Sequence, residues 1–270
     1  MPRDLYDCTA SDLATHSIEH LQRETSPSDA AAWLADRGYD AAPVYDGGDP
    51  LGFVHKDDVS TDDAGDTLDN HLTPLTIDYM ISGDADFTAV LAALIENPVY
   101  FIGGHNHVSG VLTRADLNTA PARIYLFDRI TYLEEHLRAL ILDRAPNWTA
   151  NHVSASVLDD IENRHAEAEA ANVALDKVHY AQFSTLESVV ASDEACWRAC
   201  GFDTKGAASA ELDAVTDLRN DVAHANLLVE NTGGDGVLNT GRTTENLHDT
   251  LETIDNVLAN LQDAGYDPED

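Results

Sequence analysis

The chain has 270 residues, with 15 lysines and arginines against 49 aspartates and glutamates, and a formal net charge of −34 at pH 7. Because 43% of the residues are hydrophobic and recur with helix and strand periods, the composition excludes a disordered chain. No apolar run approaches a membrane span, and the N-terminus lacks a signal-peptide core. We therefore expect a cytoplasmic protein that is long enough for two domains. The element patterns described below place these domains at residues 1–120 and 121–270 and predict an α+β fold.

The acidic residues are scattered through periodic segments, which is typical of proteins from an extremely halophilic cytoplasm. At molar salt the Debye length is only about 3 Å, so global repulsion of a polyanion is screened and local contacts decide binding. The charge therefore makes RNA binding less expected without excluding it. The three cysteines are too few for a zinc site or a disulfide framework, and we expect them to pack in the core.

The N-terminal half repeats one order of elements. Residues 17–59 predict a strand, a helix over 28–37 and strands over 42–45 and 51–54. The same order follows as a strand over 76–81, a helix over 87–96 and strands over 99–102 and 108–113, after which residues 114–117 open another helix. A β-α-β-β unit that occurs twice indicates a paired domain, because each copy leaves a sheet face for the other to cover.

Residues 110–116 (Gly-Val-Leu-Thr-Arg-Ala-Asp) consist of a glycine, two apolar residues, a hydroxyl residue, two variable residues and an aspartate. With this motif the half resembles a tandem cystathionine-β-synthase (CBS) pair. The resemblance implies a site for an adenine nucleotide of the AMP or ATP type, with Thr113 and Asp116 on the ribose and phosphates. A carboxylate can accept hydrogen bonds from two adjacent ribose hydroxyls, while Arg114 or Lys56 offers a cation to a phosphate.

The first copy of the motif, within residues 46–58, departs from this pattern. His55 stands where a hydroxyl residue is expected, although Asp58 keeps the acidic position. We therefore expect a ligand at the second copy before the first. Many modules of this kind bind nothing and serve as dimerisation platforms, and that alternative stays open here.

Two histidine clusters have simpler interpretations than a metal centre. His16, Glu19 and His20 match the H-x-x-E-H pattern of inverted zinc peptidases, which needs both histidines on one helix face. If this stretch leads into the first strand, alternation turns Glu19 away from the histidines, and no zinc site forms. His105 and His107 follow two glycines and predict an exposed hairpin loop.

From residue 121 onward the apolar period is helical, which predicts a five-helix antiparallel bundle. The first helix runs to about residue 143. An acidic helix over 156–176, helices over 180–190 and around Trp197, a helix ending near His224, a loop over 231–241 and a helix over 243–261 follow. The first helix carries arginines that either pair with nearby acids or face a phosphate: Arg123, Arg129, Arg138 and Arg144.

Residues 219–224 (Arg-Asn-Asp-Val-Ala-His) combine a permanent cation with a side chain that exchanges protons near neutrality. Such a pair can cleave RNA without a metal. On an ideal helix Arg219 and His224 lie about 140° apart, so convergence requires the helix to end at residue 223 or 224, or two copies to meet across a dimer axis. Alternatively His224 caps the last carbonyls of a buried helix end and Arg219 pairs with an acid.

With this motif, and with residues 126–138 similar to its opening helix, the second half resembles the HEPN superfamily of helical domains. The resemblance implies a homodimer and, in many members, a metal-independent endoribonuclease that needs no cofactor. Arg219 would then bind the phosphate, His224 would act as the acid-base group, and Asn220 would orient either of them. Some members keep the fold without the chemistry.

The leading hypothesis is a homodimeric ribonuclease whose CBS-like pair senses an adenine nucleotide and biases the HEPN-like dimer between two arrangements. Such coupling needs only a ligand with different affinities for the two arrangements. The alternative is a non-catalytic protein that binds ligand and dimerises. Arg219 and His224 in one open interfacial cleft would favour the enzyme, and separate buried pockets would favour the alternative.

Overall fold

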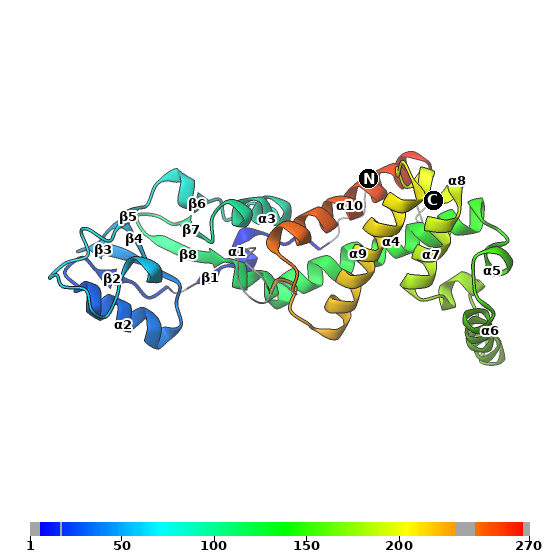
Figure 1. Cartoon of the computed structure of the whole chain (residues 1–270), viewed down its shortest axis with the longest axis horizontal. Coiled ribbons are helices and arrows are strands. Elements are labelled where there is room, and N and C mark those ends of the chain that lie inside the picture. Colours follow the sequence, from blue (N-terminus) through cyan, green and yellow to red (C-terminus); the bar gives the residue numbers. More distant parts are fainter. Residues whose placement is uncertain (1–5, 17, 231–240, 267–270) are drawn as a thin grey trace. The chain divides into compact units, whose positions relative to one another are not determined.

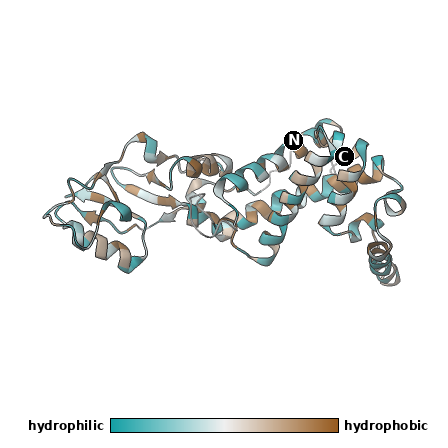
Figure 2. Ribbon diagram, viewed as in Figure 1, coloured by the Kyte–Doolittle hydropathy of each residue, from teal (hydrophilic) through white to brown (hydrophobic). Residues whose placement is uncertain are grey.

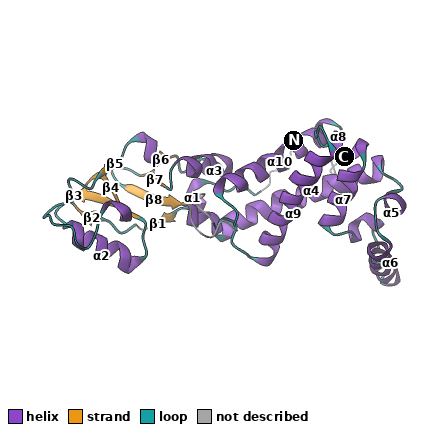
Figure 3. Cartoon of the chain, in the orientation of Figure 1, coloured by secondary structure: helices purple, strands orange, loops and turns teal. Residues whose placement is uncertain are grey.

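The computed structural model describes residues 6–16, 18–230 and 241–266, and the chain divides into two compact units. The division falls between Ala122 and Arg123, inside helix α4 (Ala120–Arg144). We call residues 7–122 the N-terminal unit and the described residues from 123 onward the helical unit. All of the described strands lie in the N-terminal unit (Figure 3), which confirms the expected α+β class.

The N-terminal unit contains the β-α-β-β order twice (Figure 1). Short elements precede the first copy and link the two copies: α1 (Ala10–Leu13), β1 (Thr15–His16), β5 (Thr73–Pro74) and the 3-10 helix η2 (Ile77–Tyr79). The first copy contains β2 (Leu21–Gln22), α2 (Pro27–Arg37), β3 (Ala41–Asp46), β4 (Asp49–His55) and the 3-10 helix η1 (Lys56–Asp58). The second contains β6 (Met80–Ile81), α3 (Phe87–Glu96), β7 (Val99–Gly103), β8 (Val108–Thr113) and the 3-10 helix η3 (Arg114–Asn118).

Each copy forms a four-stranded mixed sheet, with orders β2-β3-β4-β5 and β1-β8-β7-β6. The first strand of each copy pairs parallel to the next, and the following pairs are antiparallel. The register shifts after the fourth residue of an inner strand in both sheets, after Val44 in β3 and after Ile102 in β7. The N-terminal strand β1 pairs with β8 of the second copy rather than with a strand of the first. Strand β1, which precedes the first copy, thus forms the edge of the second copy's sheet.

Apolar residues from both sheets form one shared cluster. Phe53 of the first sheet packs with Val99, Phe101 and Val108 of the second, and the Phe53 and Phe101 rings lie 5.0 Å apart between centroids. The backbone N–H of Val108 donates to the Tyr45 hydroxyl at 2.9 Å in this buried region. Each sheet thus covers the apolar face of the other.

Gly38 and Gly52 are required by backbone geometry. Gly38 ends α2 in the left-handed region, at φ 66°, where a side chain would be strained. A Cβ at Gly52 would lie 2.4 Å from the Thr73 carbonyl oxygen, so only glycine lets β5 pair with β4.

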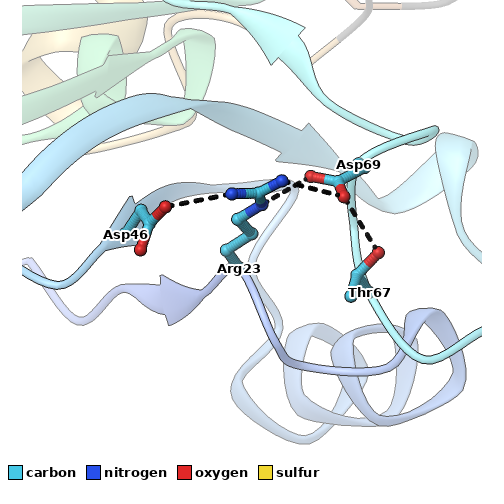
Figure 4. Close-up of polar contacts among 4 residues, drawn as sticks. All are labelled: Arg23, Asp46, Thr67 and Asp69. Atoms are coloured by element: carbon cyan, nitrogen blue, oxygen red, sulfur yellow. Dashed lines mark hydrogen bonds and ion pairs between the residues drawn. The ribbon is translucent and has the colours of Figure 1, made fainter.

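Arg23 fastens the segment after β4 to the first sheet (Figure 4). Its guanidinium donates to both oxygens of Asp69, at 2.7 and 3.2 Å, and to Asp46 at 3.1 Å. Thr67 donates to the same Asp69 carboxylate at 3.2 Å. The Arg23 hydrogen bonds lower the pKa of Asp69, so this exposed bidentate pair stays ionised at neutral pH.

The helical unit contains three long helices and several short ones. The helices after α4 are α5 (Trp148–Asn151), α6 (Ala155–Ala170), the 3-10 helix η4 (Lys177–Tyr180), α7 (Phe183–Ser192), α8 (Glu194–Ala199), α9 (Lys205–His224) and α10 (Thr244–Asp263). Apolar residues recur among hydrophilic ones along these helices (Figure 2). Among the described helices, none is long and apolar enough to span a bilayer.

Two expected elements differ from the structure. The strand expected over 76–81 is reduced to Met80–Ile81, because the 3-10 turn η2 occupies residues 77–79. The acidic helix expected over 156–176 ends at Ala170, because Asn172 adopts the left-handed region at φ 57°. The expected loop over 231–241 falls almost entirely outside the described residues.

The core of the helical unit supplies a stability test. Leu133 on α4 is fully buried, whereas Leu227 is 52% exposed. Leu133→Ala should reduce the free energy of unfolding by about 2–5 kcal/mol, because it leaves a cavity. Leu227→Ala should change it by less than about 0.5 kcal/mol. Denaturant unfolding at constant KCl, followed by circular dichroism at 222 nm, measures both, and equal midpoints for the two variants would contradict this packing.

Candidate functional sites

A pocket of about 270 Å³ lies in the N-terminal unit, and we call it the Asp116 pocket. Its described lining combines an apolar wall, two hydroxyls and three carboxylates: Ile18, Ala41 and Val111; Thr15 and Thr113; and Glu19, Asp40 and Asp116. Gly38, Tyr39 and Ala115 complete it. The volume is close to that of small-ligand sites. An apolar wall beside hydrogen-bonding groups suits a flat ring that carries a polar sugar.

The Asp116 carboxylate is positioned by the start of η3. One oxygen accepts from the Thr113 backbone N–H at 2.7 Å and from the Thr113 hydroxyl at 2.9 Å. The first of these bonds is one half of a capping box, in which the Thr113 side chain accepts from the Asp116 backbone N–H in return. The other oxygen accepts from the Thr15 hydroxyl at 3.5 Å. Burial raises the pKa of Asp116, while the hydrogen bonds from Thr113 and Thr15 act in the opposite direction. The second oxygen, with its longer bond, is the one with capacity for a ligand hydroxyl.

The four ligand candidates from the sequence do not all meet here. Thr113 and Asp116 line the pocket, whereas Arg114 and Asp58 are not among its described lining residues. Arg114 donates instead to the carbonyl oxygens of Leu94 and Ile95, at 2.8 and 3.3 Å, at the end of α3. Asp58 is exposed in η1, where its carbonyl oxygen lies 2.6 Å from the His71 ring.

Sequence reasoning missed Thr15, Glu19 and Asp40 as pocket residues. They lie about 75 to 100 positions before Asp116, and β1 brings Thr15 there by pairing with β8. A two-residue strand leaves no periodic signal. The closest available signal was the repeat itself, because paired copies place the start of one beside the end of the other.

A second cavity, of about 470 Å³, lies in the helical unit, and we call it the His224 pocket. Arg219, Asn220 and His224 all line it, so the structure brings the three sequence candidates together within one chain. The rest of the described lining comes from α6, α7 and the segment before α7, and from the preceding turn of α9: Arg164, Gln182, Phe183, Ser184 and Thr216.

Helix α9 ends at His224, which meets the geometric condition for Arg219 and His224 to converge. Ala225 adopts the left-handed region at φ 56°, and its N–H bonds back to the carbonyls of Asp221 and Val222. Asn226 donates from its backbone to the Asp221 carbonyl at 2.9 Å. These bonds satisfy the carbonyls of Asp221 and Val222 without the His224 side chain, and His224 is exposed.

Arg219 is held by an amide rather than by an acid. One of its nitrogens lies 3.5 Å from the Asn220 side-chain oxygen, and among the described residues no carboxylate forms an ion pair with it. Among the described residues, the guanidinium is therefore not neutralised by a carboxylate. The alternative in which Arg219 pairs with an acid is not what the described residues show.

Beneath the His224 pocket, Glu187 of α7 is buried and accepts from the Thr216 hydroxyl at 2.8 Å. Burial raises the pKa of Glu187, the Thr216 hydrogen bond lowers it and the nearby Asp213 and Asp217 raise it, and the net pKa is about 6. This contact fixes Thr216 in the wall of the pocket and joins α7 to α9.

Of the four arginines on α4, none is among the described lining residues of the His224 pocket. Arg129 pairs with Asp255, Arg138 with Glu134 and Arg144 with Asp143. These three therefore follow the pairing interpretation. The pocket instead receives Arg164 of the acidic helix α6.

The H-x-x-E-H residues do not form a metal site. The His16 ring contacts two carbonyl oxygens, Glu19 pairs with Arg37 at 2.5 Å, and the His20 ring packs on Tyr45. His105 and His107 lie in the turn between β7 and β8, as expected of a hairpin loop. Over the described part of the chain, the grouping able to hold a metal ion is a different one, His248 with Asp249 and Glu252 on α10.

Comparisons with known proteins agree on one kind of fold. The chain is similar to a CBS domain-containing protein of unknown function from Bacillus anthracis, with 19% identity over 43% of this chain and 94% of that chain and a TM-score of 0.37. It is similar to CBSX2, whose structure was solved in complex with AMP, with 19% identity over 43% of this chain and 97% of that chain and a TM-score of 0.37.

The chain is also similar to the CBS domain of a bacterial CNNM/CorC family Mg²⁺ transporter in complex with ATP. The identity is 17% over 40% of this chain and 83% of that chain, with a TM-score of 0.35. At these identities the similarity concerns the fold alone. No family model and no curated protein matches the chain.

His16, which neighbours Thr15 on β1, should make the N-terminal unit sensitive to pH. Its Nδ1 lies 3.0 Å from the Ser109 carbonyl oxygen and its Nε2 lies 2.8 Å from that of Ser11. A neutral imidazole has one N–H, so only the charged ring donates to both. These bonds, to Ser109 first and then to Ser11, raise the pKa of His16.

Because the folded-state pKa of His16 is raised above its ordinary value, its stabilisation is complete below about pH 6.5 and is lost as pH rises through the folded pKa. The melting temperature of His16→Gln should therefore fall furthest below that of the wild type near pH 6 and approach it above pH 8. Thermal melts of both proteins across this range measure the difference. A gap that does not vary with pH would refute the charged bridge.

Proposed function

We propose that the chain is a metal-independent endoribonuclease of the HEPN type whose CBS-like pair senses an adenine nucleotide. The observation that carries the enzymatic part is that Arg219, Asn220 and His224 line one cavity at the end of α9. The observation that carries the sensing part is the Asp116 pocket, in which a half-buried carboxylate and two hydroxyls face an apolar wall.

In the proposed reaction, His224 removes the proton from a ribose 2′-hydroxyl, and the oxygen attacks the adjacent phosphorus. Arg219 stabilises the negative charge that builds on the phosphate oxygens, and Asn220 keeps the guanidinium oriented. The leaving 5′-oxygen takes up a proton, and the products carry 2′,3′-cyclic phosphate and 5′-hydroxyl ends. Because Arg219 has no described acidic partner, a phosphate does not have to displace one.

In the proposed sensing site, Asp116 accepts from the ribose hydroxyls while the base lies against Ile18, Ala41 and Val111. The nucleotide acts as a regulator rather than as a cofactor of the reaction. We further propose that the protein works as a homodimer. Ile124 and Phe127, three residues apart on α4, are 50% and 58% exposed, and a second copy would cover them.

Cleavage of a short labelled RNA by the purified chain in high KCl with EDTA tests the enzymatic part. Arg219→Ala and His224→Ala should each lower the cleavage rate by about 100-fold or more, because each removes a group that acts in the transition state. Arg198→Ala should leave the rate unchanged, since Arg198 is exposed and pairs with Glu194 outside the pocket.

The products should carry 2′,3′-cyclic phosphate ends, and DNA of the same sequence, which has no 2′-hydroxyl, should stay intact. Cleavage that persists in both variants would refute this assignment. Nucleotide binding without any RNA cleavage would favour the non-catalytic alternative.

Calorimetric titration of the full chain with AMP tests the sensing part. Asp116→Asn should weaken binding by about tenfold or more, because the amide is a poorer acceptor for two ribose hydroxyls. Asp58→Asn is the matched control, since Asp58 holds the same motif position in the first copy and does not line the pocket. Equal weakening by both variants would contradict a site at Asp116.

A further inference from the structure

The Asp116 pocket has an unusual charge for a nucleotide site. Its described lining contains three carboxylates, those of Glu19, Asp40 and Asp116, and no lysine or arginine. A phosphate group that enters such a pocket meets charges of its own sign. Phosphate sites in proteins are ordinarily formed by arginine, lysine or free backbone N–H groups.

The nearest cations are already bound by acids of the pocket. Arg37 donates to Glu19 at 2.5 Å and lies over the Trp33 ring at 4.4 Å. Lys56 donates to Asp40 at 2.5 Å. A phosphate would have to compete with Glu19 and Asp40 for these two cations.

Two further candidate donors to a phosphate, the Arg114 guanidinium and the Thr113 N–H, are also engaged. The Arg114 guanidinium follows the motif threonine directly, but it donates to carbonyl oxygens at the end of α3. The N–H of Thr113 is bonded to Asp116 within the capping box. At the start of η3, the Arg114 guanidinium and the Thr113 N–H are therefore both engaged within the protein.

The nucleoside part of a ligand faces the opposite situation. Ribose hydroxyls are donors, and Asp116 is an acceptor with one weakly engaged oxygen, 3.5 Å from Thr15. Ile18 and Val111 pack against the shared apolar cluster and present a fixed surface to a flat base. Among the described lining residues, the carboxylate of Asp116 and the apolar wall thus favour the sugar and the base of a ligand.

We propose that the Asp116 pocket recognises the adenosine portion of its ligand and discriminates against phosphate, so that adenosine binds at least as tightly as AMP and more tightly than ATP. This inference rests on the proposed sensing function and specifies its ligand class. The protein would then respond to the nucleoside rather than to the phosphorylation state of the adenine nucleotide pool.

The test is calorimetric titration of the full chain with adenosine, AMP and ATP, without divalent cations, at the lowest KCl concentration that preserves the circular dichroism spectrum. ATP should bind at least about tenfold more weakly than adenosine. Raising KCl should narrow this gap, because salt screens repulsion between charges. Adenosine binding should change little with KCl.

Glu19→Gln and Asp40→Asn are the diagnostic variants. Each removes one carboxylate from the pocket and releases a cation, Arg37 or Lys56, so each should raise AMP affinity relative to adenosine by about threefold to tenfold. Asp36→Asn is the control, because Asp36 is exposed on the same helix as Arg37, changes the net charge equally and does not line the pocket.

Three outcomes would overturn the inference, and they are distinguishable. AMP or ATP binding more tightly than adenosine would refute phosphate discrimination and leave the sensing function intact. Unchanged AMP-to-adenosine ratios in both diagnostic variants would refute the role of Glu19 and Asp40. No binding of any of the three ligands would refute the sensing function together with this inference.

Discussion

Positive charge is scarce in this protein, and this limits which side chains are available to bind an anion. With 15 lysines and arginines against 49 acids, a cation usually has a carboxylate within reach. Arg23, Arg37, Lys56 and Arg129 are held in this way. Arg219 departs from the pattern, since its described partner is the amide of Asn220. The two candidate sites therefore differ in kind: the cations next to the Asp116 pocket are paired with acids, whereas Arg219 lines the His224 pocket without a carboxylate partner among the described residues.

The N-terminal unit acquires its pocket from the exchange of a strand between repeats. Strand β1 precedes the first copy but pairs with β8 of the second, so Thr15 reaches Asp116 across a separation of 101 residues. The shared cluster around Phe53 and Phe101 holds the two sheets together. The copies are not equivalent at the motif, because His55 replaces the threonine whose hydroxyl and N–H position Asp116 in the second copy.

The candidate catalytic residues of the helical unit lie at the C-terminal end of α9. The left-handed residue Ala225 ends α9 directly after His224, and backbone N–H groups bond to the carbonyls of Asp221 and Val222. The ring is thus released from capping and lines the same cavity as Arg219. About one turn before Arg219 on α9, the Thr216 hydroxyl donates to the buried acid Glu187. A five-residue spacing that is unfavourable on a continuous helix becomes workable at the helix end.

The sequence by itself determined the order of the elements, the α+β class, the repeat, and the motifs at residues 110–116 and 219–224, because periodicity and turn residues are local properties. It overextended the strand at 76–81, where the 3-10 turn over 77–79 replaces strand pairing, and the helix at 156–176, which ends before the left-handed residue Asn172. Only the tertiary structure decided that Thr15, Glu19 and Asp40 join Asp116, that Arg114 turns to α3, and that Arg164 joins His224. The physical reason is that side-chain contacts between distant segments depend on strand exchange and helix packing, which leave no mark at fixed spacing along the chain.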